Sequence, residues 1–243
     1  MNRETKNHRY ALSEELFQEL HDLAKRLDRE NSSCSCDGVF VPRVGKLYGE
    51  KDAPRIMFVG KATAGWGGDS KSLEDDWQAT ENFYDKLYNG EYKSQFWYYI
   101  RGLTREIYKE VGLNYENDIQ WAVDRVIWSN LMKIGVNGSQ PYGRLASEQR
   151  PMMKRILAYE MHNLRPDAII LCTNDYEAKL VEEVFGAQNA ETIAYVGSDP
   201  IDSTLVEEID AKLYWTRHPQ GWAKNEAERI IAEDFGKWFK SKP

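Results

Sequence analysis

Hydrophobic residues in this chain form short continuous runs separated by longer stretches with helical spacing. The runs at residues 55–59, 125–134 and 168–172 predict strands that are covered on both faces, because neither side of such a strand carries the polar residues that solvent favours. Shorter strands are predicted near residues 192–196 and 212–216, and another at 39–41, where Pro42 stops the run.

The stretches with helical spacing lie between these runs. The first is predicted to begin at Ser13, whose side chain can cap a helix over residues 13–30 with Leu16, Leu20, Leu23 and Leu27 on one face. Further helices are predicted near residues 73–88, 93–111, 147–163, 176–185 and 224–240. Alternating strands and helices predict one α/β domain over residues 1–243, built as α/β/α layers, with the first helix packed on it.

Composition narrows the class of protein. Hydrophobic residues make up 42% and charged residues 29%, which excludes a wholly disordered chain. No apolar run approaches the roughly 18 residues of a membrane span, so no membrane association is expected. Three cysteines and an N-terminus without an apolar segment favour a cytoplasmic protein, which we expect to be a monomer. A net charge of -7 confines any nucleic-acid interface to a local basic area.

Four loops follow the predicted strands, at residues 60–69, 130–143, 173–175 and 217–222. If the sheet is parallel, all four gather at the carboxyl ends of the strands, where open α/β sheets bind ligands. His218 precedes Pro219, and its imidazole can donate a hydrogen bond to an anion or move a proton near neutral pH. The alternative is that its ring caps backbone groups within the turn.

Asn130 lies inside an otherwise apolar run. One amide offers both a donor and an acceptor, which suits the edge of a nucleobase, whereas the alternative is a structural hydrogen bond to a nearby loop. The glycines of residues 60–68 let a backbone approach a ligand closely, although the loop matches no phosphate-binding motif.

The cysteines and an aromatic run point less directly to a function. Cys34 and Cys36 lack the partners of a zinc or iron–sulfur site, so we expect no metal and no cofactor. The aromatic residues 96–99 could stack on bases, but their helical spacing favours a place in the core.

Four segments taken together resemble the ordered motifs of the uracil-DNA glycosylase superfamily. They are VGKATAG at residues 59–65, WSNLMK at 128–133, LRPDAIIL at 164–171 and HPQ at 218–220, and the resemblance extends over residues 55–222. It implies a mainly parallel, four-stranded sheet between helices, and a hydrolase of DNA repair that removes a base from DNA. Such an enzyme flips its target base out of the stack and into a pocket.

The resemblance also implies roles for individual residues. The first loop would shape the base pocket through Gly60, Lys61, Thr63, Gly65 and Trp66. Asn130 would read the base edge, and His218 would stabilise the negative charge on the departing base. Gln220 and Trp222 would enter the duplex beside the flipped base.

The chain differs from the family in its acid. The start of the first loop has no Asp, Glu or Asn where active members carry one, and Asp69 is the nearest carboxylate that could serve catalysis. The expected function is therefore binding of a nucleobase, DNA or single-stranded nucleic acid in the cleft, with hydrolysis of an N-glycosidic bond left open. One alternative is a non-catalytic module on the same fold that binds single-stranded nucleic acid or a protein partner, with phosphate contacts from Lys212, Arg217 and Lys224. Another is a small-molecule enzyme that uses the glycine-rich loop for a nucleotide or a phosphate.

Overall fold

The structure, a computed structural model, describes residues 12–30, 38–62, 72–136, 139–220, 222 and 224–242. These residues form seven strands and seven α-helices, with two short 3₁₀-helices at Ala187–Asn189 and Glu207–Ile209. The strands are β1 (Arg43–Val44), β2 (Ile56–Gly60), β3 (Val126–Asn130), β4 (Ala168–Cys172), β5 (Glu191–Val196), β6 (Asp199–Val206) and β7 (Ala211–Thr216). The helices are α2 (Glu14–Glu30), α3 (Leu73–Tyr88), α4 (Gln95–Glu110), α5 (Ile119–Val123), α6 (Gly143–Leu164), α7 (Ala178–Phe185) and α8 (Lys224–Lys240).

The strands form one mixed sheet in the order β1-β3-β2-β4-β7-β6-β5. The four central strands, β3, β2, β4 and β7, are parallel to one another. Antiparallel strands extend the sheet at both ends, with β1 beside β3 and the pair β6 and β5 beside β7. The α/β class is confirmed, but the predicted four-stranded sheet is wrong, because the described sheet has seven strands.

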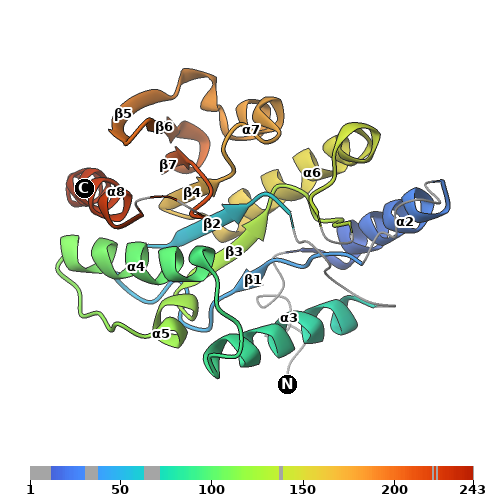
Figure 1. Cartoon of the computed structure of the whole chain (residues 1–243), viewed down its shortest axis with the longest axis horizontal. Helices are drawn as coiled ribbons and strands as arrows, with labels where there is room; N and C mark the ends of the chain where they lie inside the picture. Colours follow the sequence, from blue (N-terminus) through green and yellow to red (C-terminus); the bar gives the residue numbers. More distant parts are fainter. Residues whose placement is uncertain are drawn as a thin grey trace.

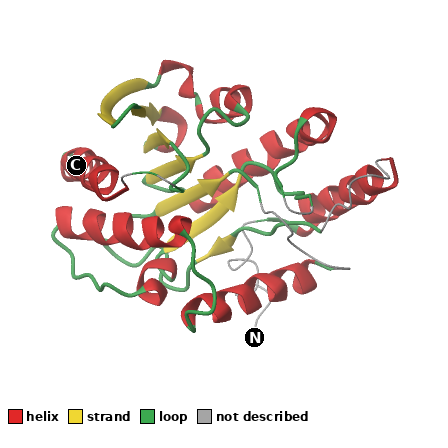
Figure 2. Ribbon diagram, in the orientation of Figure 1, coloured by secondary structure: helices red, strands yellow, loops and turns green. Residues whose placement is uncertain are grey.

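Helices cover both faces of the sheet (Figures 1 and 2). Helices α2, α6 and α7 pack against one face, where Met57 and Val59 of β2 point. Helices α3, α4, α5 and α8 supply the core on the other face, which receives Ile56 and Phe58. Because successive side chains of a strand point to opposite faces, a strand covered on both sides is apolar throughout, as β2 is.

The predicted start of the first helix is confirmed, whereas the predicted start of α6 is wrong, and β3 ends at Asn130 and not at residue 134 as predicted. The Ser13 side chain caps α2, accepting a hydrogen bond from the Leu16 amide at 3.2 Å. Helix α6 begins at Gly143 and not at Ser147, whose hydroxyl donates instead to the carbonyl of Arg144. Pro151, which has no amide hydrogen to donate, lies inside this helix.

Strands β1 and β6 and helix α5 were not predicted. Strand β1 has only two residues, too few for a pattern, and residues 39–41 form a single bridge from Val39 to Ile134 in place of the predicted strand. Strand β6 contains Pro200 and polar residues that argue against a strand away from the edge of a sheet. Pairing with β5 and β7 overrides that local preference.

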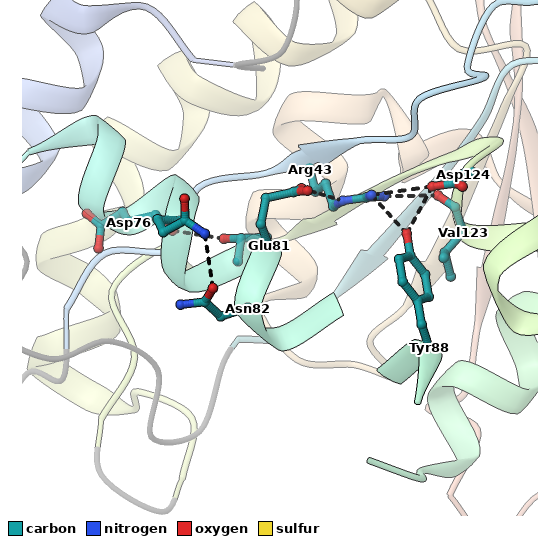
Figure 3. A network of polar contacts seen from close by, with 9 residues as sticks. Arg43, Asp76, Glu81, Asn82, Tyr88, Val123 and Asp124 are labelled. Atoms are coloured by element: carbon teal, nitrogen blue, oxygen red, sulfur yellow. Dashed lines mark hydrogen bonds and ion pairs between the residues drawn. The ribbon is translucent and has the colours of Figure 1, made fainter. Parts of the chain in front are cut away.

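A buried arginine joins β1 to the helical layer beside it (Figure 3). Arg43 donates to Glu81 of α3 at 2.9 Å and to the Tyr88 hydroxyl at 3.0 Å, and it lies 3.4 Å from Asp124. Tyr88 in turn donates to Asp124 at 2.9 Å. The guanidinium therefore has partners on α3 and at the end of α5, and it holds both against the edge of the sheet.

No helix in the described part of the chain combines the length and the apolar character that crossing a membrane requires.

Candidate functional site at the carboxyl ends of the parallel strands

The four loops singled out in the sequence follow four neighbouring parallel strands. Gly60, at the end of β2, is paired in register with Asn130, at the end of β3. Cys172 and Thr216, the last residues of β4 and β7, are paired in the same way. The carboxyl ends of these strands therefore share one edge of the sheet, which we call the rim, and the described parts of the loops continue from it.

At the rim, the Asn130 side chain is buried and faces the backbone of β2. A Cβ atom on Gly60 would lie 2.4 Å from the Asn130 Oδ1, so glycine is what leaves room for the amide. The Asn130 Nδ2 is buried and has no hydrogen-bond partner in the described part of the chain. Because buried polar groups are nearly always hydrogen-bonded, an unpaired amide donor at a sheet edge indicates a place for a ligand acceptor.

A fully buried charge pair lies behind Asn130. The Lys133 Nζ donates to the backbone carbonyl of Asn130 at 2.7 Å and lies 2.8 Å from the Glu160 carboxylate on α6. The Ser129 hydroxyl donates to the same carboxylate at 2.7 Å. Burial lowers the pKa of Lys133 and raises the pKa of Glu160, while their mutual attraction opposes both shifts. This network orients the end of β3. No local sequence pattern indicates the network, because it joins β3 to a residue of α6.

His218 is held by the neighbouring loop. Its backbone amide donates to the Asn174 Oδ1 at 2.6 Å, and Asn174 adopts a left-handed conformation (φ 53°) that asparagine tolerates better than most residues. The amide of Gln220 donates to the His218 Nδ1 at 3.4 Å. A ring that accepts at Nδ1 carries its proton on Nε2, which leaves that atom as the donor for a ligand.

Burial lowers the pKa of His218 from its ordinary value, and the positive charge of Lys61 lowers it further. The imidazole therefore stays neutral to a lower pH than an exposed histidine. A neutral imidazole can hydrogen-bond a developing anion through Nε2 without first losing a proton.

Phe96, at the start of α4, lies between these two parts of the rim. Its Cζ is 3.9 Å from the position that a Cβ on Gly60 would occupy. Its ring stacks on His218 with centroids 6.1 Å apart and planes 11° apart. The aromatic run was expected in the core, and the helix divides it: Trp97 and Tyr99 are buried, whereas Phe96 and Tyr98 are partly exposed.

Substitution of Lys61 by glutamine is expected to raise the pKa of His218, because it removes a nearby positive charge that disfavours the imidazolium. NMR titration of the His218 ring protons measures this shift, with Lys46→Gln as a control that removes the same charge elsewhere. An unchanged His218 pKa would contradict the proximity of the two groups.

The remaining predicted site residues fall in different places. Gln220 is exposed next to His218, as contact with a ligand requires. Trp222 is 9% exposed and packs on Tyr99 with ring centroids 5.9 Å apart, which is a core position. Thr63, Gly65, Trp66 and Asp69 lie outside the described residues, as do Cys34 and Cys36.

The proposed phosphate contacts do not gather in one place. Lys212 pairs with Ala168 at the amino end of the parallel strands, opposite the rim, and lies 3.1 Å from Asp234. The length of β7 therefore separates Lys212 from His218. Arg217 is at the rim but forms an ion pair with Asp199 at 2.8 Å. Lys224 begins α8, just beyond the rim loop.

Within the described ranges, no three His, Cys, Asp or Glu residues come together as a metal site would require. Cys172 is buried, and burial raises the pKa of its thiol to about 12, so it is not a reactive thiolate at neutral pH.

Comparison with known proteins gives no assignment: no protein-family model matches the chain, and no curated protein is similar enough in sequence to serve as a relative.

Proposed function

We propose that this chain binds a nucleobase at the rim, as part of a nucleic acid, in the manner of the uracil-DNA glycosylase superfamily that its motifs resemble. The unpaired, buried Nδ2 of Asn130 carries the proposal. It is a hydrogen-bond donor without an acceptor in the described part of the chain, and it lies in the same part of the rim as the His218 imidazole and the Phe96 ring.

The three groups match the three demands of a base pocket. The Asn130 amide reads donor and acceptor positions on the base edge. The Phe96 ring supplies an aromatic surface of the kind on which bases stack. His218 supplies a neutral donor for a base oxygen, and this interaction strengthens if negative charge develops there.

Hydrolysis is a separate question from binding. Cleavage of an N-glycosidic bond leaves negative charge on the base and positive charge on the sugar, so a carboxylate is needed to stabilise the sugar and orient water. Within the described parts of the four loops, Asp175 is the sole carboxylate, and it is exposed. This observation favours a second candidate, a binding module without hydrolase activity.

Binding is tested by the thermal stability of the purified chain with nucleobases, nucleosides and short single-stranded oligonucleotides. Ligands that bind the native state raise the melting temperature. Asn130→Asp replaces the amide donor with an acceptor, so we expect it to shift preference from uracil to bases with an exocyclic amine, such as cytosine. Gly60→Ala is expected to abolish base binding, because its Cβ would displace the Asn130 amide.

Controls come from the exposed end of α6. Asn163→Asp makes the same chemical change as Asn130→Asp away from the rim, and it should leave ligand preference unaltered. If no base, nucleoside or oligonucleotide raises the melting temperature of the wild type, the proposal is wrong.

Excision is tested with a uracil-containing oligonucleotide. If the chain hydrolyses the bond, His218→Ala should slow excision by about 10²–10³-fold, as removal of an oxyanion donor does in other enzymes, whereas His162→Ala on the surface of α6 should not. Binding without excision in the wild type would support the second candidate.

A further inference from the structure

Outside the rim, the structure contains two adjacent cavities of about 310 and 290 Å³ between α4 and α8. Asn225 and Glu228 of α8 line both of them. The smaller cavity is also lined by Tyr98, Arg101 and Gly102 of α4 and by Lys224. Figure 1 shows the two helices side by side over the same face of the sheet.

Glu228, which lines both cavities, is only 4% exposed. Its carboxyl group covers Gly102 so closely that a Cβ there would lie 2.3 Å from the Glu228 Oε2. No described residue forms a hydrogen bond or ion pair with this carboxyl group. Burial is the main cause that raises the pKa of Glu228 to about 7, so near neutral pH a large share of the molecules carry a proton here and can donate it in a hydrogen bond.

Positive charge faces the same cavity. Among the described residues, the buried Arg101 Nε has no hydrogen-bond partner, and the guanidinium carbon lies 5.4 Å from the centre of the Tyr98 ring. The Lys224 Nζ lies 6.0 Å from the same ring and donates to Gln95. Arg101 and Lys224 both lower the pKa of Glu228, which places their charges near its carboxyl group.

These groups share one chemical preference. The Arg101 guanidinium, whose Nε has no partner among the described residues, the Lys224 ammonium and a carboxyl group able to donate together favour an oxygen-rich anion over a cation. In the neighbouring cavity, Arg105 forms an ion pair with Glu106, and Arg229 forms one with Glu233. The neighbouring cavity therefore offers less free positive charge.

We propose that the cavity lined by Arg101, Lys224 and Glu228 binds a phosphate group. Arg101 and Lys224 would bind its oxygens, and the protonated carboxyl of Glu228 would donate a further hydrogen bond. The phosphate belongs either to a small phosphorylated molecule or to the backbone of a nucleic acid. No rim residue takes part, so this proposal and the base-binding proposal can fail independently.

Titration calorimetry with inorganic phosphate, in a phosphate-free and sulfate-free buffer, tests the site directly. We expect saturable binding of one phosphate to the wild type, with perturbation of the Gly102 and Asn225 amide resonances in a parallel NMR titration. Arg101→Gln and Lys224→Gln should each weaken binding roughly tenfold or more, because each removes a charged donor. Glu228→Gln should retain binding within about threefold, since a neutral amide also donates.

Lys237→Gln is the matched control, because it removes one positive charge from an exposed position farther along α8. Failure of phosphate to bind, or equal binding to Arg101→Gln and Lys237→Gln, would overturn the proposal. The source of the phosphate is separated by two further ligands. A nucleoside monophosphate presents a terminal phosphate, whereas an oligonucleotide without terminal phosphates presents only diesters, and Arg101→Gln should weaken whichever of the two the site accepts.

Discussion

Replacing Lys133 with methionine is expected to lower the free energy of unfolding by about 3–5 kcal/mol, the usual cost of removing one partner from a buried ion pair. The Lys133 and Glu160 side chains are both 0% exposed. Without the ammonium, the Ser129 hydroxyl is the one hydrogen-bond donor that the described residues offer to the Glu160 carboxylate. A charge left in a low-dielectric interior without its counter-ion destabilises the native state.

The double variant Lys133→Met with Glu160→Met isolates this cause. It removes both charges and replaces them with apolar side chains of similar length, so we expect it to recover most of the lost stability. Urea unfolding at pH 7 measures all three proteins. A single variant within 1 kcal/mol of the wild type, or a double variant less stable than the single one, would contradict the role of the pair.

The pH dependence of the single variant gives an independent check. Burial already raises the pKa of Glu160, and loss of Lys133 removes the attraction that opposes this shift. In the variant, Glu160 therefore stays protonated in the folded state at pH values where the same carboxyl group in the unfolded chain has already lost its proton. Its stability should fall as the pH rises from the unfolded pKa toward the raised folded one, so the deficit is larger at pH 8 than at pH 5.

Replacing Arg43 with methionine is expected to cost about 3 kcal/mol, again because buried partners lose their counter-ion. The side chain is 3% exposed and contacts Glu81, Tyr88 and Asp124 (Figure 3). Arg43→Lys should recover only part of this stability, because an ammonium on a flexible stem cannot replace the several donors of the guanidinium.

The control for Arg43 is Arg155→Met. Arg155 also pairs with a glutamate, Glu19, but its side chain is 56% exposed. Exposed pairs contribute about 0–1 kcal/mol, so this variant should unfold close to the wild type. If both arginine variants lose the same stability in urea unfolding, burial of the Arg43 network is not the cause.

These two networks bear on the candidate site to different degrees. The pair of Lys133 and Glu160 binds the carbonyl of Asn130, so its loss is expected to weaken base binding at the rim as well as stability. Arg43 lies on β1, which pairs with β3 through Arg43 and Trp128 and does not reach Asn130, so its loss should reduce stability and leave ligand preference unchanged.

The sequence alone was sufficient for the buried strands, most of the helices and the α/β class. Strands β2 and β4 and helix α2 are specified locally, by runs of apolar residues and by the Ser13 cap, and such signals need no knowledge of the partners. The sequence also predicted a site at the ends of four strands, because parallel strands bring their carboxyl ends to one edge of the sheet.

Only the tertiary structure decided what depends on pairing between distant segments. Strand β6 exists because β5 and β7 pair with it, although Pro200 argues against a strand. Lys212 proved to lie at the far end of β7 from His218, because the strand residues Leu213–Thr216 and then Arg217 separate them along an extended chain. The unpaired Asn130 amide, the Phe96 ring on His218 and the Glu228 carboxyl over Gly102 arise where elements from different parts of the chain meet. Local sequence patterns cannot encode these contacts, since burial and desolvation are properties of the assembled core.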